Sequence, residues 1–60
     1  MKLKFYRENN KFTQKDIAKI LGKNRVTIAR WEAGNVTPKL ETIIKLAKLY
    51  NCTTDDLIFS

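Results

Sequence analysis

The chain has 60 residues, 43% of them hydrophobic, and twelve lysines and arginines against six acidic residues give it a net charge of +6. This length predicts a single domain spanning residues 1–60, with one small hydrophobic core. One cysteine, no histidine and no long apolar run argue against an internal disulfide, a metal site, an enzyme and a membrane span. We therefore expect a cytoplasmic protein without cofactor or small-molecule ligand. Its charge favours nucleic acid or an anionic membrane surface as partner.

Apolar residues recur at spacings of three and four throughout and nowhere alternate strictly, which predicts an all-α bundle of five short helices. The first helix is expected over residues 2–9, with Leu3 and Tyr6 facing inward. It should end at Asn10 and Lys11, because asparagine tolerates the left-handed conformation that ends helices.

The second helix is expected over residues 14–21 and the third over residues 25–33. Thr13 is the predicted N-cap of the second helix, and Asp16 stands three residues later, as in a capping box. Gly22 should end this helix, because glycine has no Cβ to oppose the sharp turn.

The fourth helix is expected to begin with Thr37 as N-cap and Pro38 in its first turn, and to run to Tyr50. Its expected inner stripe consists of Leu40, Ile43, Ile44, Ala47 and Tyr50. Thr53 should cap a last helical turn, whose first residues are acidic and so suit the helix dipole.

Only Gly22, Lys23 and Asn24 separate the second and third helices. A glycine-containing turn this short makes two helices cross steeply, and Ile28 and Trp31 are spaced to fill the space beneath. The second and third helices therefore predict a helix-turn-helix. In that motif the third helix lies in the major groove of DNA.

The segment 12–34, FTQKDIAKILGKNRVTIARWEAG, resembles the lambda-repressor-like, Cro-type (Xre) helix-turn-helix family, and the similarity continues through residues 38–42 and 46–47. The resemblance implies a bacterial or phage transcriptional regulator that binds double-stranded DNA as a homodimer. Lys11 stands where the family often has glycine, so the first loop is expected to be strained or differently shaped. Lys23 occupies a turn position that is commonly apolar in the family.

Four residues on the outward face of the third helix are the predicted base-reading set: Arg25, Val26, Thr27 and Arg30. The family places Arg25, Val26 and Arg30 at its usual base-reading positions. Arginine can donate two hydrogen bonds to guanine, and valine can contact only a thymine methyl group. The alternative for each arginine is a phosphate contact without sequence preference.

Six residues are the predicted phosphate contacts: Gln14, Lys23, Asn24, Asn35, Thr37 and Lys39. Gln14 begins the second helix, whose free N–H groups should abut the sugar-phosphate backbone. Asn24 is also the predicted N-cap of the third helix. The alternative for the whole set is a solvated side chain.

The resemblance also implies a partly buried ion pair between Arg7 and Glu32, which would fix the first helix against the third. Leu57, Ile58 and Phe59 form an apolar run near an otherwise polar terminus, and they are the predicted dimer contact.

The leading functional hypothesis is a repressor that binds a palindromic operator as a homodimer. An activator, an antitoxin-type protein, a nonspecific DNA-binding protein and a protein-interaction module remain alternatives.

Overall fold

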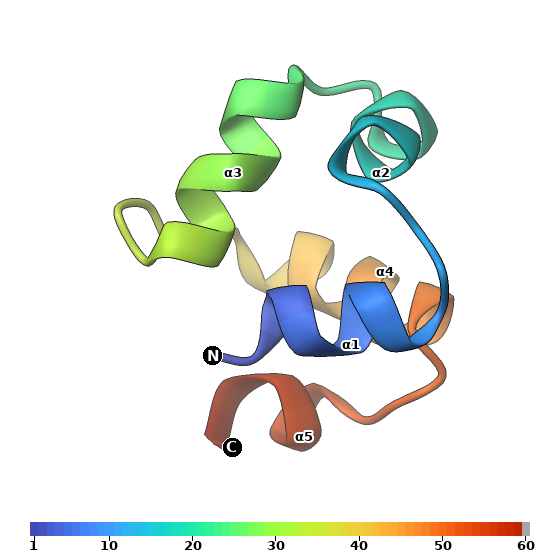
Figure 1. Cartoon of the computed structure of the whole chain (residues 1–60). Coiled ribbons are helices and arrows are strands. Elements are labelled where there is room, and N and C mark those ends of the chain that lie inside the picture. The colour runs from blue at the N-terminus through green and yellow to red at the C-terminus, as the bar shows by residue number, and fades with distance from the viewer. Residues whose placement is uncertain (60) are drawn as a thin grey trace.

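The computed structural model describes residues 1–59, and within them the chain forms five helices and no strand. The helices are α1 (Leu3–Asn9), α2 (Gln14–Leu21), α3 (Arg25–Ala33), α4 (Leu40–Leu49) and α5 (Thr54–Phe59). They pack into a body of 25 × 23 × 18 Å, in which α2 and α3 lie against each other (Figure 1). The predicted all-α fold with a helix-turn-helix is confirmed.

Two threonine caps start α2 and α5. The Oγ1 atom of Thr13 accepts a hydrogen bond of 3.0 Å from the backbone N–H of Asp16, whose carboxylate accepts one of 2.9 Å from Thr13 N–H. These hydrogen bonds hold the pKa of the Asp16 carboxyl below its ordinary value. Thr53 and Asp56 make the same reciprocal pair at α5, with both distances 3.0 Å. The predicted caps are therefore confirmed, and each satisfies N–H groups that have no partner within the helix.

Glycines end both α2 and α3, as expected for α2 at Gly22. Gly22 and Gly34 follow these helices with φ angles of 66° and 82°, in the left-handed region that side chains with a Cβ disfavour. Asn24 occupies the N-cap position of α3, but its side chain makes no capping hydrogen bond. The predicted N-cap position at Asn24 is therefore confirmed, but without the side-chain hydrogen bond that an asparagine cap can supply.

Each of the five helices contributes to one hydrophobic core. The buried apolar residues are Leu3, Ile17, Ala18, Ile28, Trp31, Ile43, Leu46, Ala47, Tyr50 and Leu57. Tyr50 follows α4 directly, and burial raises the pKa of its phenol. A chain this short buries only about 60% of the surface that it exposes when unfolded, so few of these side chains are dispensable.

The start of α4 differs from the prediction. Lys39 is the N-cap in place of Thr37, and the helix begins at Leu40. Pro38 lies buried in the segment before the helix, whereas Leu40 and Ile44 are 65% and 40% exposed. Proline is compatible with both an extended segment and a first helical turn, so Pro38 did not determine where the predicted helix begins. Because side chains tilt toward the N-terminus of their helix, the first residue of α4 projects past the edge of the core.

The left-handed residue after α1 is Lys11, with a φ of 63°, while the preceding Asn10 has a φ of −96°. The side-chain amide of Asn10 donates to the backbone carbonyls of Tyr6 and Tyr50, both at 2.8 Å. The prediction that asparagine would take the left-handed conformation is therefore wrong. The expectation of a strained first loop is confirmed.

We expect Lys11→Gly to stabilise the protein by about 0.5–1 kcal/mol. Left-handed backbone costs a non-glycine residue roughly 1–2 kcal/mol, and the greater unfolded-state entropy of glycine offsets part of the gain. Urea denaturation followed by circular dichroism measures the difference. Asn10→Gly is the control, and it should lower the midpoint because three side-chain hydrogen bonds, to Tyr6, Tyr50 and Asn51, are lost. A lower midpoint for Lys11→Gly would contradict the strain at this position.

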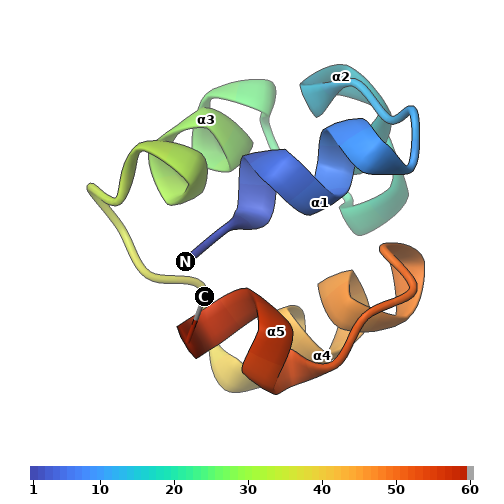
Figure 2. The same ribbon diagram turned by 60° about the horizontal axis from the view of Figure 1, so that its bottom comes forward.

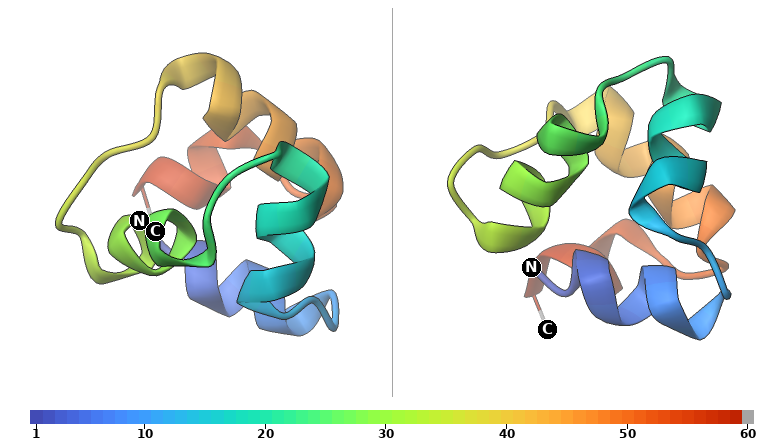
Figure 3. Two further views of the ribbon diagram at one scale, coloured as in Figure 1. Left: turned by 90° about the horizontal axis from the view of Figure 1, so that it is seen from above. Right: turned by 45° about the horizontal axis from the view of Figure 1, so that its top comes forward.

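The first residues of the chain lie beside α5. The backbone N–H of Lys2 donates to the carbonyl of Leu57 at 3.1 Å. The two ends of the ribbon consequently meet, as Figures 1 and 2 both show. The turn between α2 and α3 lies at the opposite end of the molecule (Figures 1 and 3).

Candidate nucleic-acid interface

The turn between α2 and α3 is closed by backbone hydrogen bonds. Lys23 N–H donates to the carbonyl of Ala18 at 2.8 Å, and Gly22 N–H donates to that of Lys19 at 3.3 Å. These bonds satisfy the last carbonyls of α2 and turn the chain sharply into α3 (Figure 3). One face of α3 remains at the surface as a result.

The two faces of α3 differ in the way that the sequence predicted. Ile28 and Trp31 are 2% and 7% exposed and belong to the core. On the other face Arg25, Val26 and Arg30 are exposed, and Thr27 on the flank is half-buried. The structure therefore brings the four predicted base-reading residues onto the accessible surface of a single helix.

Arg25 does not project freely into solvent, because its guanidinium donates to the side-chain carbonyl of Gln14 at 3.0 Å. The amide nitrogen of Gln14 in turn donates to the Oε1 atom of Glu32, also at 3.0 Å. The first residue of α2 therefore links the first residue of α3 to a carboxylate near the end of α3.

Glu32 is held by Arg7 from α1. The Nε and Nη2 atoms of Arg7 donate to the two carboxylate oxygens at 2.6 and 3.1 Å, and Nη1 donates to the carbonyl of Phe12 at 2.7 Å. The two side chains are 8% and 5% exposed. The hydrogen bond to Glu32 raises the pKa of Arg7, although burial acts in the opposite direction.

These side chains form one hydrogen-bonded network, which we call the Arg25 network: Arg7, Gln14, Arg25 and Glu32. Every buried side-chain nitrogen and oxygen in residues 1–59 has a partner, so the network leaves no buried polar group unsatisfied. The Arg7–Glu32 end of the network is buried, and one exposed hydrogen bond through Gln14 connects Arg25 to it. The sequence had predicted independent contacts with DNA for Gln14 and Arg25, and it contained no signal for the bond between them.

Three of the predicted phosphate contacts lie together. Lys23, Thr37 and Lys39 line one surface cleft of about 240 Å³ beside the N-terminus of α4. Asn24 and Asn35 are exposed and do not line this cleft. The sixth residue, Gln14, belongs to the Arg25 network, and its amide nitrogen has a second N–H that could reach a phosphate.

The predicted dimer contact needs a correction at Leu57. Leu57 is completely buried in the core, and Ile58 is partly buried against it. Phe59 is 80% exposed. A domain this small needs most of its large apolar side chains to build a core, and this explains why Leu57 is buried and not available for a dimer contact. Of the three residues, only Phe59 has an accessible side chain large enough to anchor a contact.

Residues 1–59 contain no group of three or more acidic, cysteine or histidine side chains placed to hold a metal ion. None of the helices in this part of the chain has the length and apolar character to cross a membrane.

Comparison with known proteins identifies relatives in bacteria and archaea. Residues 3–57 match a family model described as helix-turn-helix. An HTH-type transcriptional regulator of Methanocaldococcus jannaschii is 41% identical over 56 residues, which cover 93% of this chain and 85% of that protein. The HTH-type transcriptional regulator DicA of Escherichia coli is 29% identical, covering 97% of this chain but 43% of DicA.

The HTH-type transcriptional activator BcrR of Enterococcus faecalis is 32% identical, covering 95% of this chain and 28% of BcrR. The chain therefore spans less than half the length of DicA and of BcrR. No solved structure is significantly similar to the chain.

Proposed function

The chain belongs to the helix-turn-helix family of DNA-binding transcriptional regulators, and from this premise we propose that it represses transcription by binding a palindromic operator as a homodimer. The observation that carries the proposal is the accessible face of α3, where Arg25, Val26 and Arg30 are exposed around a buried Ile28 and Trp31. A helix with this face fits the major groove, and the two arginines would read guanine.

The Arg25 network supports a base-reading role for Arg25. An arginine whose side chain is already held in place loses less conformational entropy on binding than a solvated one. Gln14 would use its second N–H to contact the backbone phosphate next to the base that Arg25 reads. The two residues would then act as one unit.

The cleft formed by Lys23, Thr37 and Lys39 is the proposed phosphate contact on the other side of α3. Its two lysines outnumber the one carboxylate that lines it, that of Glu41, and the first turn of α4 lies beside them. Contacts of this kind fix the register of the protein on DNA but carry no sequence information.

We expect Lys39→Ala to weaken binding about equally on all sequences, and to lower the slope of log K against log salt by about 1. The physical reason is that the variant neutralises one phosphate less than the wild type, so its binding to DNA releases about one counterion less. Fluorescence anisotropy on one duplex at several salt concentrations measures the slope. Lys4→Ala is the control, because it removes the same charge from an exposed position on α1, outside the cleft and outside α2 and α3. Equal slopes for Lys39→Ala and the wild type would remove Lys39 from the interface.

Selection from a random duplex library at near-physiological salt tests the function. The expected result is an enriched palindrome whose half-sites lie about one helical turn, roughly 34 Å, apart. Salt-sensitive binding without enrichment would contradict sequence-specific recognition and favour a nonspecific DNA-binding protein.

Activation is the second candidate, and the similarity to BcrR, which is named an activator, favours it. A reporter assay with the selected operator placed over or upstream of a promoter separates the two roles. Repression predicts a lower signal when the operator overlaps the promoter, and activation predicts a higher signal from the upstream site.

A further inference from the structure

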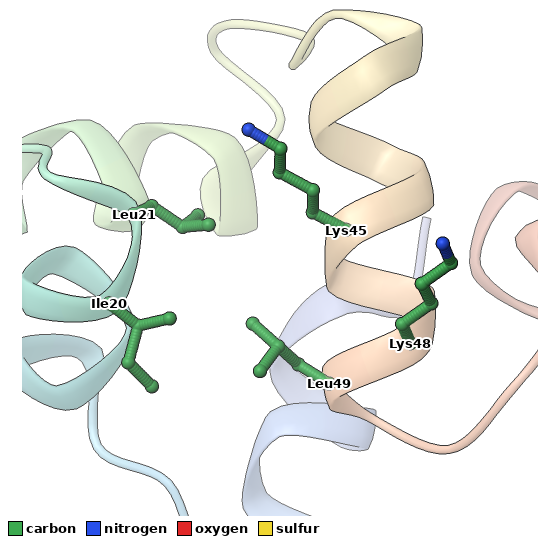
Figure 4. Close-up of a pocket in the computed structure, with 5 residues that line it drawn as sticks. All are labelled: Ile20, Leu21, Lys45, Lys48 and Leu49. Carbon is green, nitrogen blue, oxygen red and sulfur yellow. The ribbon is translucent and has the colours of Figure 1, made fainter.

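A groove separates α2 from α4 on the surface of the molecule. Ile20 and Leu21 line it from α2, and Lys45, Lys48 and Leu49 line it from α4, around a volume of about 470 Å³. Figure 4 shows Leu49 pointing toward Ile20 across the groove, and Lys45 reaching over it. We call this feature the α2–α4 groove. Its walls are apolar and its rim is basic.

Ile20 is 52% exposed and lies next to other apolar surface, so it is part of a patch and not an isolated exposed side chain. Leu21 and Leu49 are partly buried and pack against the core beneath it. The α2–α4 groove therefore offers apolar area that this chain does not cover itself.

The exposed side of α5 has the complementary character. Phe59 is 80% exposed, and Asp55 is an exposed acid four residues before it, so both side chains lie on one face of the helix. The distribution of charge along the sequence also separates a basic body from an acidic C-terminal segment. All twelve basic residues fall between Lys2 and Lys48, and the following residues contain two aspartates and no base.

We propose that the Asp55–Phe59 face of α5 docks into the α2–α4 groove of a second copy of this chain. Phe59 covers Ile20 and Leu49, and Asp55 approaches Lys45 at the rim. The inference rests on the homodimer proposed above and names the surface that receives Phe59. Two copies that each carry a charge of +6 repel one another, so a contact that sets an acidic end on a basic rim is the favourable orientation.

A two-fold axis makes this contact twice, because the end of each copy then meets the groove of the other. Making the contact twice doubles the area that the interface buries. A standard interface buries about 800 Å² per partner, roughly a fifth of the 4173 Å² that one chain exposes. One helix end in one groove is too small to reach this area, and two such contacts come closer to it.

The first test removes apolar surface on either side of the contact. Sedimentation equilibrium without DNA should show about a tenfold or greater loss of dimer affinity for Phe59→Ser, and also for Ile20→Ser. Val36→Ser is the matched control, because Val36 is 47% exposed and lies outside both surfaces, and it should dimerise like the wild type. All three positions are at the surface, so thermal melting should show that the variants fold.

The second test exchanges charges. Asp55→Lys puts lysine against Lys45 twice in its own dimer, and Lys45→Glu puts glutamate against Asp55 twice, so each variant alone should be mostly monomeric. In an equimolar mixture both contacts pair a base with an acid, and the heterodimer should form with near wild-type affinity. Lys15→Glu changes the net charge by the same amount as Lys45→Glu but lies on α2, outside the contact. Mixed with Asp55→Lys, it leaves one lysine–lysine contact in the heterodimer, so it should restore much less affinity than Lys45→Glu does.

The outcomes separate the inference from the function that it extends. A wild-type chain that stays monomeric at millimolar concentration would overturn both the docking and a homodimer in free solution. A wild-type dimer that Ile20→Ser leaves unchanged, with no recovery in the charge-exchange mixture, would overturn the docking alone. Operator selection is scored independently, because binding to a half-site requires no second copy.

Discussion

Replacing Glu32 by glutamine is expected to cost about 3–5 kcal/mol of folding free energy, because it leaves the charge of Arg7 buried without a counter-charge. The side chains of the pair are 8% and 5% exposed, so water screens them little. A domain of this length has a total stability of roughly 3–9 kcal/mol. We therefore expect a large unfolded population at 25 °C, visible as lost helical circular dichroism.

Glu41→Gln provides the control, because it removes an exposed acid from the first turn of α4 and should change the stability by less than about 0.5 kcal/mol. The double variant Arg7→Met with Glu32→Met removes both charges and should recover part of the loss. The midpoints of urea denaturation compare the stabilities of the three variants. If Glu32→Gln were as mild as Glu41→Gln, the ion pair would not hold α1 against α3.

Replacing Arg25 by alanine is expected to cost about 1–3 kcal/mol at one base pair of each half-site and to relax the base preference there. The selected duplex and its single-base variants, measured at one salt concentration, reveal the position. The other positions should keep their preferences. Equal weakening on every sequence would reassign Arg25 to a phosphate contact.

Gln14→Ala tests whether the Arg25 network matters for recognition. Without Gln14 the guanidinium of Arg25 loses its bond of 3.0 Å, so discrimination at the same base pair should decrease, though less than for Arg25→Ala. The double variant should be no less specific than Arg25→Ala alone, which a double-mutant cycle checks. Additive losses would mean that the two residues contact DNA independently.

Local signals explain why α2 and α3 could be predicted to the residue. Thr13 and Asp16 start α2 through contacts three residues apart, and Gly22 and Gly34 end their helices through backbone freedom. The start of α4 has no such signal, because Pro38 is compatible with either side of the boundary. Residue propensity could not predict left-handed backbone at Lys11, because the competing Asn10 is held by the carbonyls of Tyr6 in α1 and of Tyr50, 40 residues later.

The hydrogen bonds of the Arg25 network are the part of the candidate site that could not be predicted from the sequence. Gln14 bonds to residues 11 and 18 positions later in the chain, and these contacts depend on how α2 crosses α3. The Arg7–Glu32 pair spans 25 positions and was expected only through the family resemblance. Spacing along a sequence contains no information on such contacts. The burial of Leu57 was missed for the same reason, because its neighbours belong to other helices.

The meeting of the chain ends, where Lys2 bonds to the carbonyl of Leu57 at 3.1 Å, has an engineering consequence. A short glycine-serine linker could join the ends, and new termini could be opened in an exposed loop to give a circular permutant with the same core. The joined ends lie away from the turn between α2 and α3 (Figures 1 and 3). A fluorescent protein or a ligand-binding domain fused there would lie beside the last turn of α3 but away from its first turn, where Arg25 and Val26 are exposed, so the fold suits a compact sensor module.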